Sequence, residues 1–522
     1  MSEPFTITTA ISYPNGRPHI GHAYEVVATD AIARFQRMMG RDVFFQTGTD
    51  EHGLKMAQAA RGRDMEPRAL ADEMSSYFRE MNERLNISHD RFIRTSEPDH
   101  HRASQAIWRA MEANGDLYLG RYEGWYSVRD EAFYDEKEIV DGEGGAKLSP
   151  QGTPVEWTIE ESWFFRLSNY QEKLLQLYET QPDFIRPESR RNEIMRFVEG
   201  GLSDLSISRT SFDWGVPVPG TDGHVMYVWV DALTNYLTGC GYPDDDARME
   251  RYWAEGGDIT HIIGKDIVRF HAVYWPAFLM SAKLPLPRQI FGHGFLLNRG
   301  EKMSKSVGNV ADPIALADRF GVDQLRYFLL SEVTFGNDGS YSAEAIVQRS
   351  NSDLGNAFGN LAQRTLSFIA KNLEGRLPAI HGADPADADL LALIDRVVRT
   401  DIPAAMNDLA PSIAIDAWLR AAFACNQYID AQAPWGLRKT DPERMETVLA
   451  TLYIAIARLA VAILPVIPAS ASALLDHMGV PAAQRGYSAI GDDWYGPLRD
   501  SGFTLAPPKP LFPRLELTEA DA

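Results

Sequence analysis

Two short motifs, far apart in the chain, carry residue types suited to phosphate chemistry. In the first, His19 and His22 lie three residues apart with Gly21 between them. If this stretch opens a helix, both imidazoles can face one side of it, and Gly21 lets a flat ring approach the backbone. Helix N-termini also attract phosphate. Taken alone, such a histidine pair is more often a surface feature or a helix cap, so it indicates a nucleotide site only weakly.

The second motif spans residues 302–306, where Lys302 and Lys305 lie on either side of Ser304. It follows a Gly- and Asn-containing stretch at 298–300. Lysines and serines on a loop can neutralise an anionic group whose charge grows during a reaction. The alternative is a solvated turn with ordinary lysines.

The elements around the first motif follow a strand–helix–strand order. Residues 5–12 are predicted as a strand, followed by a turn at 13–16. Apolar residues then recur at helical spacing over 21–39, and Gly40 can end that helix. A second strand is predicted at 42–46. This βαβ pattern favours an α/β fold with a Rossmann-like parallel sheet.

The pattern changes twice further along the chain. Residues 117–200 are rich in aromatic and short extended pieces, which indicates an insertion. The sheet is expected to resume with strands at 259–263 and 289–297, joined by a helix at 268–282. Helical patterns then dominate, which predicts an antiparallel all-α bundle after residue 342. Its expected helices lie near 342–370, 388–407, 412–430, 442–463 and 467–478.

These patterns divide the chain into a Rossmann-like domain in two halves, an inserted domain and a C-terminal bundle. We expect the first half of the Rossmann-like domain at 1–116, the connective insertion at 117–200 and the second half at 201–310. A linking region follows at 311–341, and the helical domain with its tail covers 342–522. A chain of 522 residues is long enough for several such domains.

Composition limits the possible environments and partners. Only two cysteines occur, Cys240 and Cys425, so a disulfide framework is excluded and a reducing compartment is expected. The net charge of −21 argues against nonspecific coating of nucleic acid, because the molecule as a whole repels phosphates. The N-terminus has neither a signal-peptide nor a transit-peptide pattern. We therefore expect a cytoplasmic protein.

One apolar segment, 448–467, raises the question of a membrane span. Arg458 lies near its middle, where membrane insertion would cost roughly 2.5–3.5 kcal/mol. Pro465 also ends the helical pattern early. The segment is expected to be a buried helix of the bundle, and no membrane contact is expected.

Together the two motifs resemble the signature pair of class I aminoacyl-tRNA synthetases, and the resemblance covers nearly the whole chain. It implies that an amino acid carboxylate attacks the α-phosphorus of ATP, with Mg²⁺ assisting, and that pyrophosphate leaves. Catalysis then consists mainly of positioning and charge neutralisation. His19, His22, Lys302 and Lys305 would be the catalytic residues. The implied ATP-binding residues are His19, Gly21, His22, Gly264, Asp266, His293, Gly294, Lys302, Ser304 and Lys305.

Further stretches, at 10–16, 49–53, 227–232 and 264–267, are similar to the methionyl branch of this family. The resemblance implies that the substrates are L-methionine, ATP and the initiator and elongator tRNA(Met). Aromatic side chains suit a flexible thioether, and a buried ammonium needs a carboxylate, here Asp50. The implied methionine-binding residues are Ile11, Tyr13, Asp50, Trp229, Ala232, Leu233, Tyr236, Ile267 and His271. Without the resemblance, each aromatic residue among them is more often part of a core.

The insertion departs from the family pattern in one respect. Many methionyl enzymes carry a zinc knuckle there, but this chain has Ser127 and Asp130 where two of its cysteines would fall, and Ser149 and Gly152 near the second pair. Serine and glycine supply neither thiolate nor imidazole, so we expect no structural zinc. The insertion is also too short for a separate editing domain, so any proofreading would occur in the synthetic site.

In the family, the C-terminal bundle reads the anticodon. The resemblance places Asn360, Arg364 and Trp435 against unstacked anticodon bases, a task that suits their hydrogen-bonding edges and flat faces. On their own, such residues are ordinarily caps, surface charges and core. The chain ends at Ala522 without a further tRNA-binding module, and we expect a monomer.

Two other functions compete with this interpretation. A small-molecule nucleotidyltransferase could share the histidine motif, but it has little use for an anticodon-binding bundle. A noncatalytic tRNA-binding relative could share the fold, but it has no need to retain His19, His22, Lys302 and Lys305 together.

Overall fold

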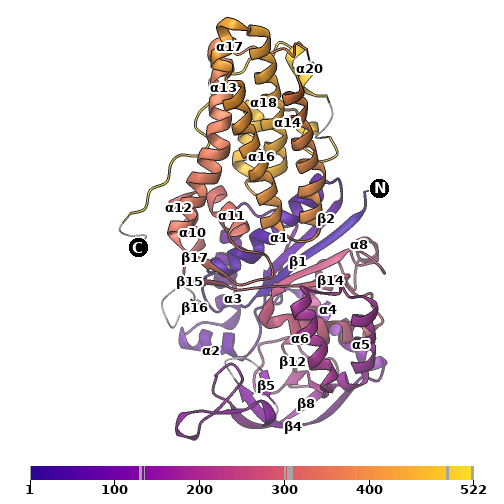
Figure 1. The fold of residues 1–522 in the computed structure, drawn as a ribbon. Coiled ribbons are helices and arrows are strands. Elements are labelled where there is room, and N and C mark those ends of the chain that lie inside the picture. Colours follow the sequence, from indigo (N-terminus) through magenta and orange to yellow (C-terminus); the bar gives the residue numbers. More distant parts are fainter. Residues whose placement is uncertain are drawn as a thin grey trace.

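The structure is a computed structural model. It describes residues 2–127, 132–134, 136–298, 301–302, 310–382, 384–489 and 493–518. A parallel sheet lies in the middle of the molecule, with a mainly antiparallel β-structure at one end and a helical bundle at the other (Figure 1). The predicted class, a Rossmann-like sheet followed by an all-α domain, is confirmed.

The central sheet has six strands, all parallel, in the order β3-β2-β1-β13-β14-β9. The strand order reverses between β1 and β13, and in such sheets ligands bind at this reversal, outside the carboxyl ends of the strands. The strands are β1 (Pro4–Ser12), β2 (Asp42–Thr49), β3 (Arg91–Arg94), β9 (Ile185–Arg186), β13 (Ile259–Gly264) and β14 (Gln289–His293).

Both faces of this sheet are covered, which explains why most residues of its central strands are buried. Val43 and Phe45 pack into the core shared with α1 and the bundle, whereas Phe44, between them, packs into the core on the opposite face. The first face is covered by α1 (Ile20–Met38), and the second by α4 (Pro98–Ala113), α7 (Trp229–Gly239) and α9 (Trp275–Ala282).

Two predicted elements near the carboxyl edge differ in detail. The strand predicted at 289–297 is interrupted at Gly294, and β15 (Leu296–Asn298) joins a separate sheet with β16 (Glu301–Lys302) and β17 (Gly339–Tyr341). A Cβ on Gly294 would lie only 2.2 Å from backbone atoms of Asn337, so the chain turns there on a glycine that allows this close approach. The helix predicted at 268–282 is a π-helical turn (Phe270–Tyr274) that continues into α9.

An antiparallel sheet of four strands, in the order β10-β8-β4-β5, takes three strands from the insertion and β10 from the residues that follow it. Its strands are β4 (Leu117–Ser127), β5 (Ala132–Tyr134), β8 (Glu156–Phe165) and β10 (Leu205–Ser206). The helices α5 (Gln171–Thr180) and α6 (Glu188–Glu199) flank β9, which pairs with β14 of the central sheet. Between residues 185 and 206 the chain therefore contributes to both sheets. Two short pairs complete the β-structure: β6 (Val140–Asp141) with β7 (Lys147–Leu148), and β11 (Ser208–Arg209) with β12 (Val225–Met226).

The C-terminal part is the predicted bundle. Its helices are α12 (Ala343–Arg349), α13 (Asn360–Asn372), α14 (Pro385–Arg396), α15 (Ile402–Asn407), α16 (Pro411–Gln432), α17 (Pro434–Thr440), α18 (Pro442–Ile463), α19 (Pro468–His477) and α20 (Tyr495–Asp500). π-helical stretches at 350–359 and 397–401 connect α12 to α13 and α14 to α15. The short helices α17 and α20 were not predicted.

Helix α18 is the one helix of the described chain long and apolar enough to cross a membrane, but 83% of its most apolar stretch is buried. The prediction of a bundle helix is confirmed.

The remaining helices surround the sheet or link it to the bundle. They are α2 (Leu54–Gly62), α3 (Pro67–Arg84), α8 (Asp246–Tyr252), α10 (Pro313–Phe320) and α11 (Val322–Ser331). At this link, Arg326 of α11 and Asp30 of α1 form a fully buried ion pair of 2.7 Å.

Candidate functional site

A cavity of about 390 Å³ opens at the carboxyl edge of the central sheet, where the strand order reverses between β1 and β13. Residues from the ends of β1, β13 and β14, the start of α1, the turn after β2 and helix α7 line it. Sixteen of the predicted site residues meet here: Ile11, Tyr13, His19, Gly21, His22, Asp50, Trp229, Ala232, Leu233, Tyr236, Gly264, Asp266, Ile267, His271, His293 and Gly294.

The two histidines of the first motif cap helix α1. Nδ1 of His19 accepts the backbone N–H of Gly21 at 3.0 Å, and Nδ1 of His22 accepts the backbone N–H of His19 at 3.1 Å. A nitrogen that accepts a hydrogen bond carries no proton, so each neutral ring has its N–H at Nε2. The rings lie 3.9 Å apart. The motif thus places two adjacent imidazole rings at a helix N-terminus that lines the cavity.

Gly21 is required by this capping geometry. The His19 ring folds back over its Cα, and a Cβ there would lie 2.8 Å from Cε1 of His19. Real Cβ atoms do not approach so closely, so any larger residue would displace the ring. The predicted role of this glycine, to let a flat ring approach the backbone, is fulfilled here by the motif's own histidine.

A third histidine of the cavity, His293 at the end of β14, is held between two acceptors. Its Nε2 lies 2.7 Å from the carboxylate of Glu25 on α1, and its Nδ1 lies 2.8 Å from the carbonyl of Gly294. Burial opposes protonation, but the hydrogen bond and charge of Glu25 outweigh it and raise the pKa of His293. The charged ring can donate to both partners at once.

At the apolar end of the cavity, Tyr236 and His271 form a hydrogen-bonded pair. The Tyr236 hydroxyl lies 2.7 Å from Nε2 of His271, whose Nδ1 lies 3.0 Å from the carbonyl of Ile267. A carbonyl only accepts, so Nδ1 carries the proton and Nε2 accepts from the hydroxyl. Burial lowers the pKa of His271 to about 4, which keeps this ring neutral. Nearby, Trp229 stacks on Phe270 at 3.6 Å between ring centres.

Asp50 also lines the cavity, on the turn that follows β2. Its backbone N–H donates to the carbonyl of Ser12 at the end of β1 at 2.9 Å. The β1–β2 pairing contains a bulge between Thr8 and Ile11, which shifts the register of β1 just before the cavity. Together these features bring the ends of β1 and β2 to the same opening.

The second motif is only partly described. The backbone of Lys302 pairs with Leu297 in the β15–β16 ladder, next to Leu296, which lines the cavity. The loop therefore begins beside the site. The side chain of Lys302, and the whole of Ser304 and Lys305, lie outside the described residues.

In the insertion, two of the four positions that correspond to a zinc knuckle, Ser127 and Ser149, hold hydroxyl groups. Oγ1 of Thr153 lies 2.7 Å from Oγ of Ser127 and 2.8 Å from Oγ of Ser149, and all three side chains are buried. Asp130 lies outside the described residues. In the part of the chain that is described, no group of three His, Cys, Asp or Glu side chains is arranged to hold a metal ion. The absence of zinc remains a prediction.

The three residues predicted to meet the anticodon lie on α13 and α17 of the bundle, and α17 is at the end of the bundle away from the sheet (Figure 1). Asn360 and Arg364 are one turn apart on α13, and the Arg364 guanidinium lies 5.4 Å from the ring centre of Trp435 on α17. Trp435 is 50% exposed, which is unusual for a tryptophan. An exposed ring beside an arginine provides a platform on which a base can stack.

Several residues that line the cavity were not predicted. They are Ala10, Ser12, Tyr24, Glu25, Asn235, Phe295 and Leu296. For Glu25 a signal existed, because it follows His22 by three residues and so lies on the same helical face. Nothing in the sequence indicated that its partner would be His293, which comes from another strand.

The parallel sheet followed by a helical bundle agrees with the comparisons with known proteins. Residues 5–366 match the family described as tRNA synthetases class I (M), and residues 378–521 match the anticodon binding domain of methionyl tRNA ligase. The chain is 59% identical to the methionine–tRNA ligase of Brucella suis biovar 1 over 99% of both chains, and 56% identical to that of Mycobacterium bovis over 98% of both. A solved structure of Mycobacterium tuberculosis methionyl-tRNA synthetase with methionyl-adenylate matches with a TM-score of 0.93 and 55% identity, covering 98% of this chain and 100% of that one.

Proposed function

The chain belongs to the class I methionyl-tRNA synthetases, and on this premise we propose which of its residues carry the reaction. The enzyme is a methionine–tRNA ligase. It uses ATP to activate L-methionine and passes the methionyl group to tRNA(Met) for initiation and elongation.

In the first step, a carboxylate oxygen of methionine attacks the α-phosphorus of ATP, and the bond to the pyrophosphate oxygen breaks. We propose that the Nε2–H groups of His19 and His22 donate to the phosphates at the N-terminus of α1. This proposal is supported by the capping geometry, which occupies both Nδ1 atoms and orients the rings. Lys302, Ser304 and Lys305 would neutralise the charge that develops on the leaving pyrophosphate.

For the adenosine, we propose Gly264, Asp266, His293 and Gly294, with Glu25 as an additional residue that holds His293. The first four follow the carboxyl ends of β13 and β14, where nucleotides bind in sheets of this order. Asp266 would accept a hydrogen bond from a ribose hydroxyl, since an ionised carboxylate is an acceptor.

For methionine, we propose that Asp50 pairs with the ammonium group and that the aromatic end of the cavity holds the thioether. Ile11, Tyr13, Trp229, Ala232, Leu233, Tyr236, Ile267 and His271 would form that pocket. The neutral state of His271 supports this assignment, because a charged ring would favour a polar ligand over a thioether.

Mg²⁺ is proposed to enter with ATP. The cavity carries the carboxylates of Glu25, Asp50 and Asp266, but these do not form a three-ligand group in the described chain. Mg²⁺ commonly keeps several waters and is held by substrate phosphates. When bound, it would supply positive charge against the phosphate oxygens. No structural zinc is proposed.

In the second step, a hydroxyl of the 3′-terminal adenosine of tRNA attacks the methionyl carbonyl, and AMP leaves. We propose that Asn360, Arg364 and Trp435 bind the anticodon. We also propose the domain limits given above, 1–116 and 201–310 for the catalytic domain, 117–200 for the insertion, 311–341 for a stem-contact region and 342–522 for the anticodon domain. We also propose that the protein acts as a monomer in the cytoplasm, where its substrates are.

The observation that carries the assignment is the convergence of the first motif and the methionine-type pocket on one cavity. The test is aminoacylation of tRNA(Met) with methionine by the wild type, by Lys305→Ala and by Asp50→Asn. Lys305→Ala should slow adenylate formation at saturating substrates, whereas Asp50→Asn should mainly raise KM for methionine. Unchanged adenylate formation in Lys305→Ala would remove the loop from the mechanism.

A further inference from the structure

The turn that carries Asp50, Thr49–Gly53, is held far more tightly than an ordinary surface turn. Such turns usually leave backbone groups to water. Here the backbone N–H of Asp50 donates to Ser12, that of Glu51 to the hydroxyl of Thr95 at 2.8 Å, and that of Gly53 to the carbonyl of Trp214 at 3.1 Å. The turn is thus attached to three separate segments of the chain.

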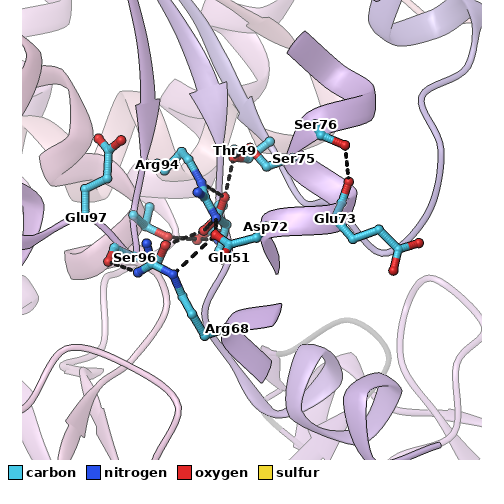
Figure 2. A network of polar contacts seen from close by, with 12 residues as sticks. Thr49, Glu51, Arg68, Asp72, Glu73, Ser75, Ser76, Arg94, Ser96 and Glu97 are labelled. Atoms are coloured by element: carbon cyan, nitrogen blue, oxygen red, sulfur yellow. Dashed lines mark hydrogen bonds and ion pairs between the residues drawn. The ribbon is translucent and has the colours of Figure 1, made fainter. Parts of the chain in front are cut away.

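Glu51 makes most of the contacts that hold this turn in place. Its side chain is fully buried, and its carboxylate accepts two hydrogen bonds from Arg94, at 2.6 and 3.0 Å. It also accepts from the hydroxyls of Thr49 and Ser96 (Figure 2). Its carbonyl accepts the indole N–H of Trp214 at 2.6 Å. The N–H, the carbonyl and the side chain of the residue next to Asp50 are therefore all fixed.

Arg94 is itself held in place. It is only 12% exposed, it is bidentate to Glu51, and it also bonds to Asp72 of α3 (Figure 2). Burial opposes its charge, but the bonds to Glu51 and Asp72 outweigh this and raise the pKa of Arg94. A planar guanidinium in a bidentate pair restrains both the distance and the angle of its partner.

Thr95 links this ion pair to Asp50. Its hydroxyl accepts the backbone N–H of Glu51 and lies 3.4 Å from Oδ1 of Asp50, to which it can donate. Its own backbone N–H donates to Thr49 at 3.2 Å. Thr95 is completely buried and does not line the cavity.

We propose that Glu51, Arg94 and Thr95 are positioning residues for recognition of the amino acid ammonium, because they fix the place of the Asp50 carboxylate in the cavity. The proposal rests on the proposed role of Asp50. None of the three lines the cavity. A charge-assisted contact is sensitive to distance and direction, so loss of this support should weaken it without removing the carboxylate.

The test compares two ligands that differ only in the ammonium. One is 5′-O-[N-(L-methionyl)sulfamoyl]adenosine, a stable analogue of the adenylate, and the other is its des-amino counterpart. The affinity for the methionyl analogue is divided by the affinity for the des-amino analogue, both measured by calorimetry. This ratio reports how much the ammonium contact contributes to binding. General damage to the fold weakens both ligands and leaves the ratio unchanged, so the ratio separates a positioning role from a structural one.

The variants are Thr95→Val, which has the same shape without the hydroxyl, and Arg94→Lys, which keeps the charge without the bidentate geometry. Each should lower the ratio by about tenfold, the size expected for a weakened charge-assisted hydrogen bond. Thr95→Ser keeps the hydroxyl and should stay within about twofold of the wild type, given the same estimate. Thr451→Val removes a buried hydroxyl from α18, which bonds to Thr447, and serves as the matched control with an unchanged ratio.

Asp50→Asn separates this inference from the proposal on which it rests. If Asp50→Asn lowers the ratio and Thr95→Val and Arg94→Lys do not, the positioning role is overturned while the role of Asp50 stands. If Asp50→Asn leaves the ratio unchanged, Asp50 does not bind the ammonium and both proposals fail. Arg94→Lys keeps the test decisive should Thr95→Val not fold.

Discussion

The hydroxyl of Tyr236 donates to Nε2 of His271 across 2.7 Å, at the apolar end of the cavity. Nδ1 of the same ring donates to the carbonyl of Ile267, so in the neutral imidazole Nε2 carries no proton and accepts from the hydroxyl. Burial acts in the same direction and lowers the pKa of His271 from 6.5 to about 4.

His271 should therefore stay neutral at every pH at which the enzyme works. Its folded-state pKa lies below the unfolded value, so protonation is expected only as the pH falls towards 4. NMR titration of labelled histidine should show no change in this ring between pH 8 and about pH 5.5, with the signal assigned through His271→Gln. A midpoint near 6.5 would contradict the proposed pocket.

Glu25 should control the charge of His293. The carboxylate raises the pKa of this histidine against the effect of burial. In Glu25→Gln, which keeps the shape and loses the charge, the pKa should fall, so His293 should lose its proton at a lower pH than in the wild type. KM for ATP should rise by about tenfold, as expected for the loss of a charged hydrogen bond.

The same titration and ATP kinetics on Glu112→Gln provide the control, since Glu112 is exposed on α4. This variant should match the wild type in both measurements. An unchanged titration of His293 in Glu25→Gln would mean that the pair seen in the structure does not set its charge.

Gly21→Ala should damage catalysis more than folding. The added Cβ would lie 2.8 Å from Cε1 of His19, so the ring must move away from its place at the start of α1. Misplacement of a catalytic group by about 1 Å can cost about a hundredfold. Methionine-dependent pyrophosphate exchange should fall by roughly ten- to a hundredfold, while the melting temperature changes little. An exchange rate close to that of the wild type would show that His19 does not act from this position.

Trp435→Ala should impair tRNA charging but not amino acid activation. The exposed indole lies beside Arg364 on the bundle, whereas the cavity lies at the sheet. Stacking on an aromatic side chain is worth about 1–3 kcal/mol per base, so KM for tRNA(Met) should rise by about five- to a hundredfold. Pyrophosphate exchange needs no tRNA and is the internal control. An unchanged KM for tRNA(Met) would argue against anticodon contact at this ring.

Local patterns in the sequence were sufficient to predict the sheet and the bundle, whereas most of the cavity residues were predicted from the resemblance to the methionyl family. Val43, Phe44 and Phe45 are consecutive apolar residues, which fits a strand covered on both faces. The spacing of His19 and His22 fits the start of a helix. The break at Gly294 was missed because its cause is the backbone of Asn337, which approaches from a distant part of the chain.

The contacts that hold the site residues in place could not be predicted from local patterns. Glu51 follows Asp50 directly, but its partner Arg94 lies on another strand, and only the register of β2 against β3 brings them together. The pair of Glu25 and His293 likewise depends on the packing of α1 against β14. Spacing along the chain predicts which face a residue lies on, whereas the identity of its partner depends on the tertiary fold.

The central claim, that this chain activates methionine with ATP at the cavity beside α1, is tested most directly by pyrophosphate exchange with each of the twenty amino acids. Methionine should support exchange far better than any other amino acid, and exchange should fall sharply when His22 is replaced by alanine. Faster exchange with leucine or isoleucine than with methionine, or full activity of His22→Ala, would contradict the account.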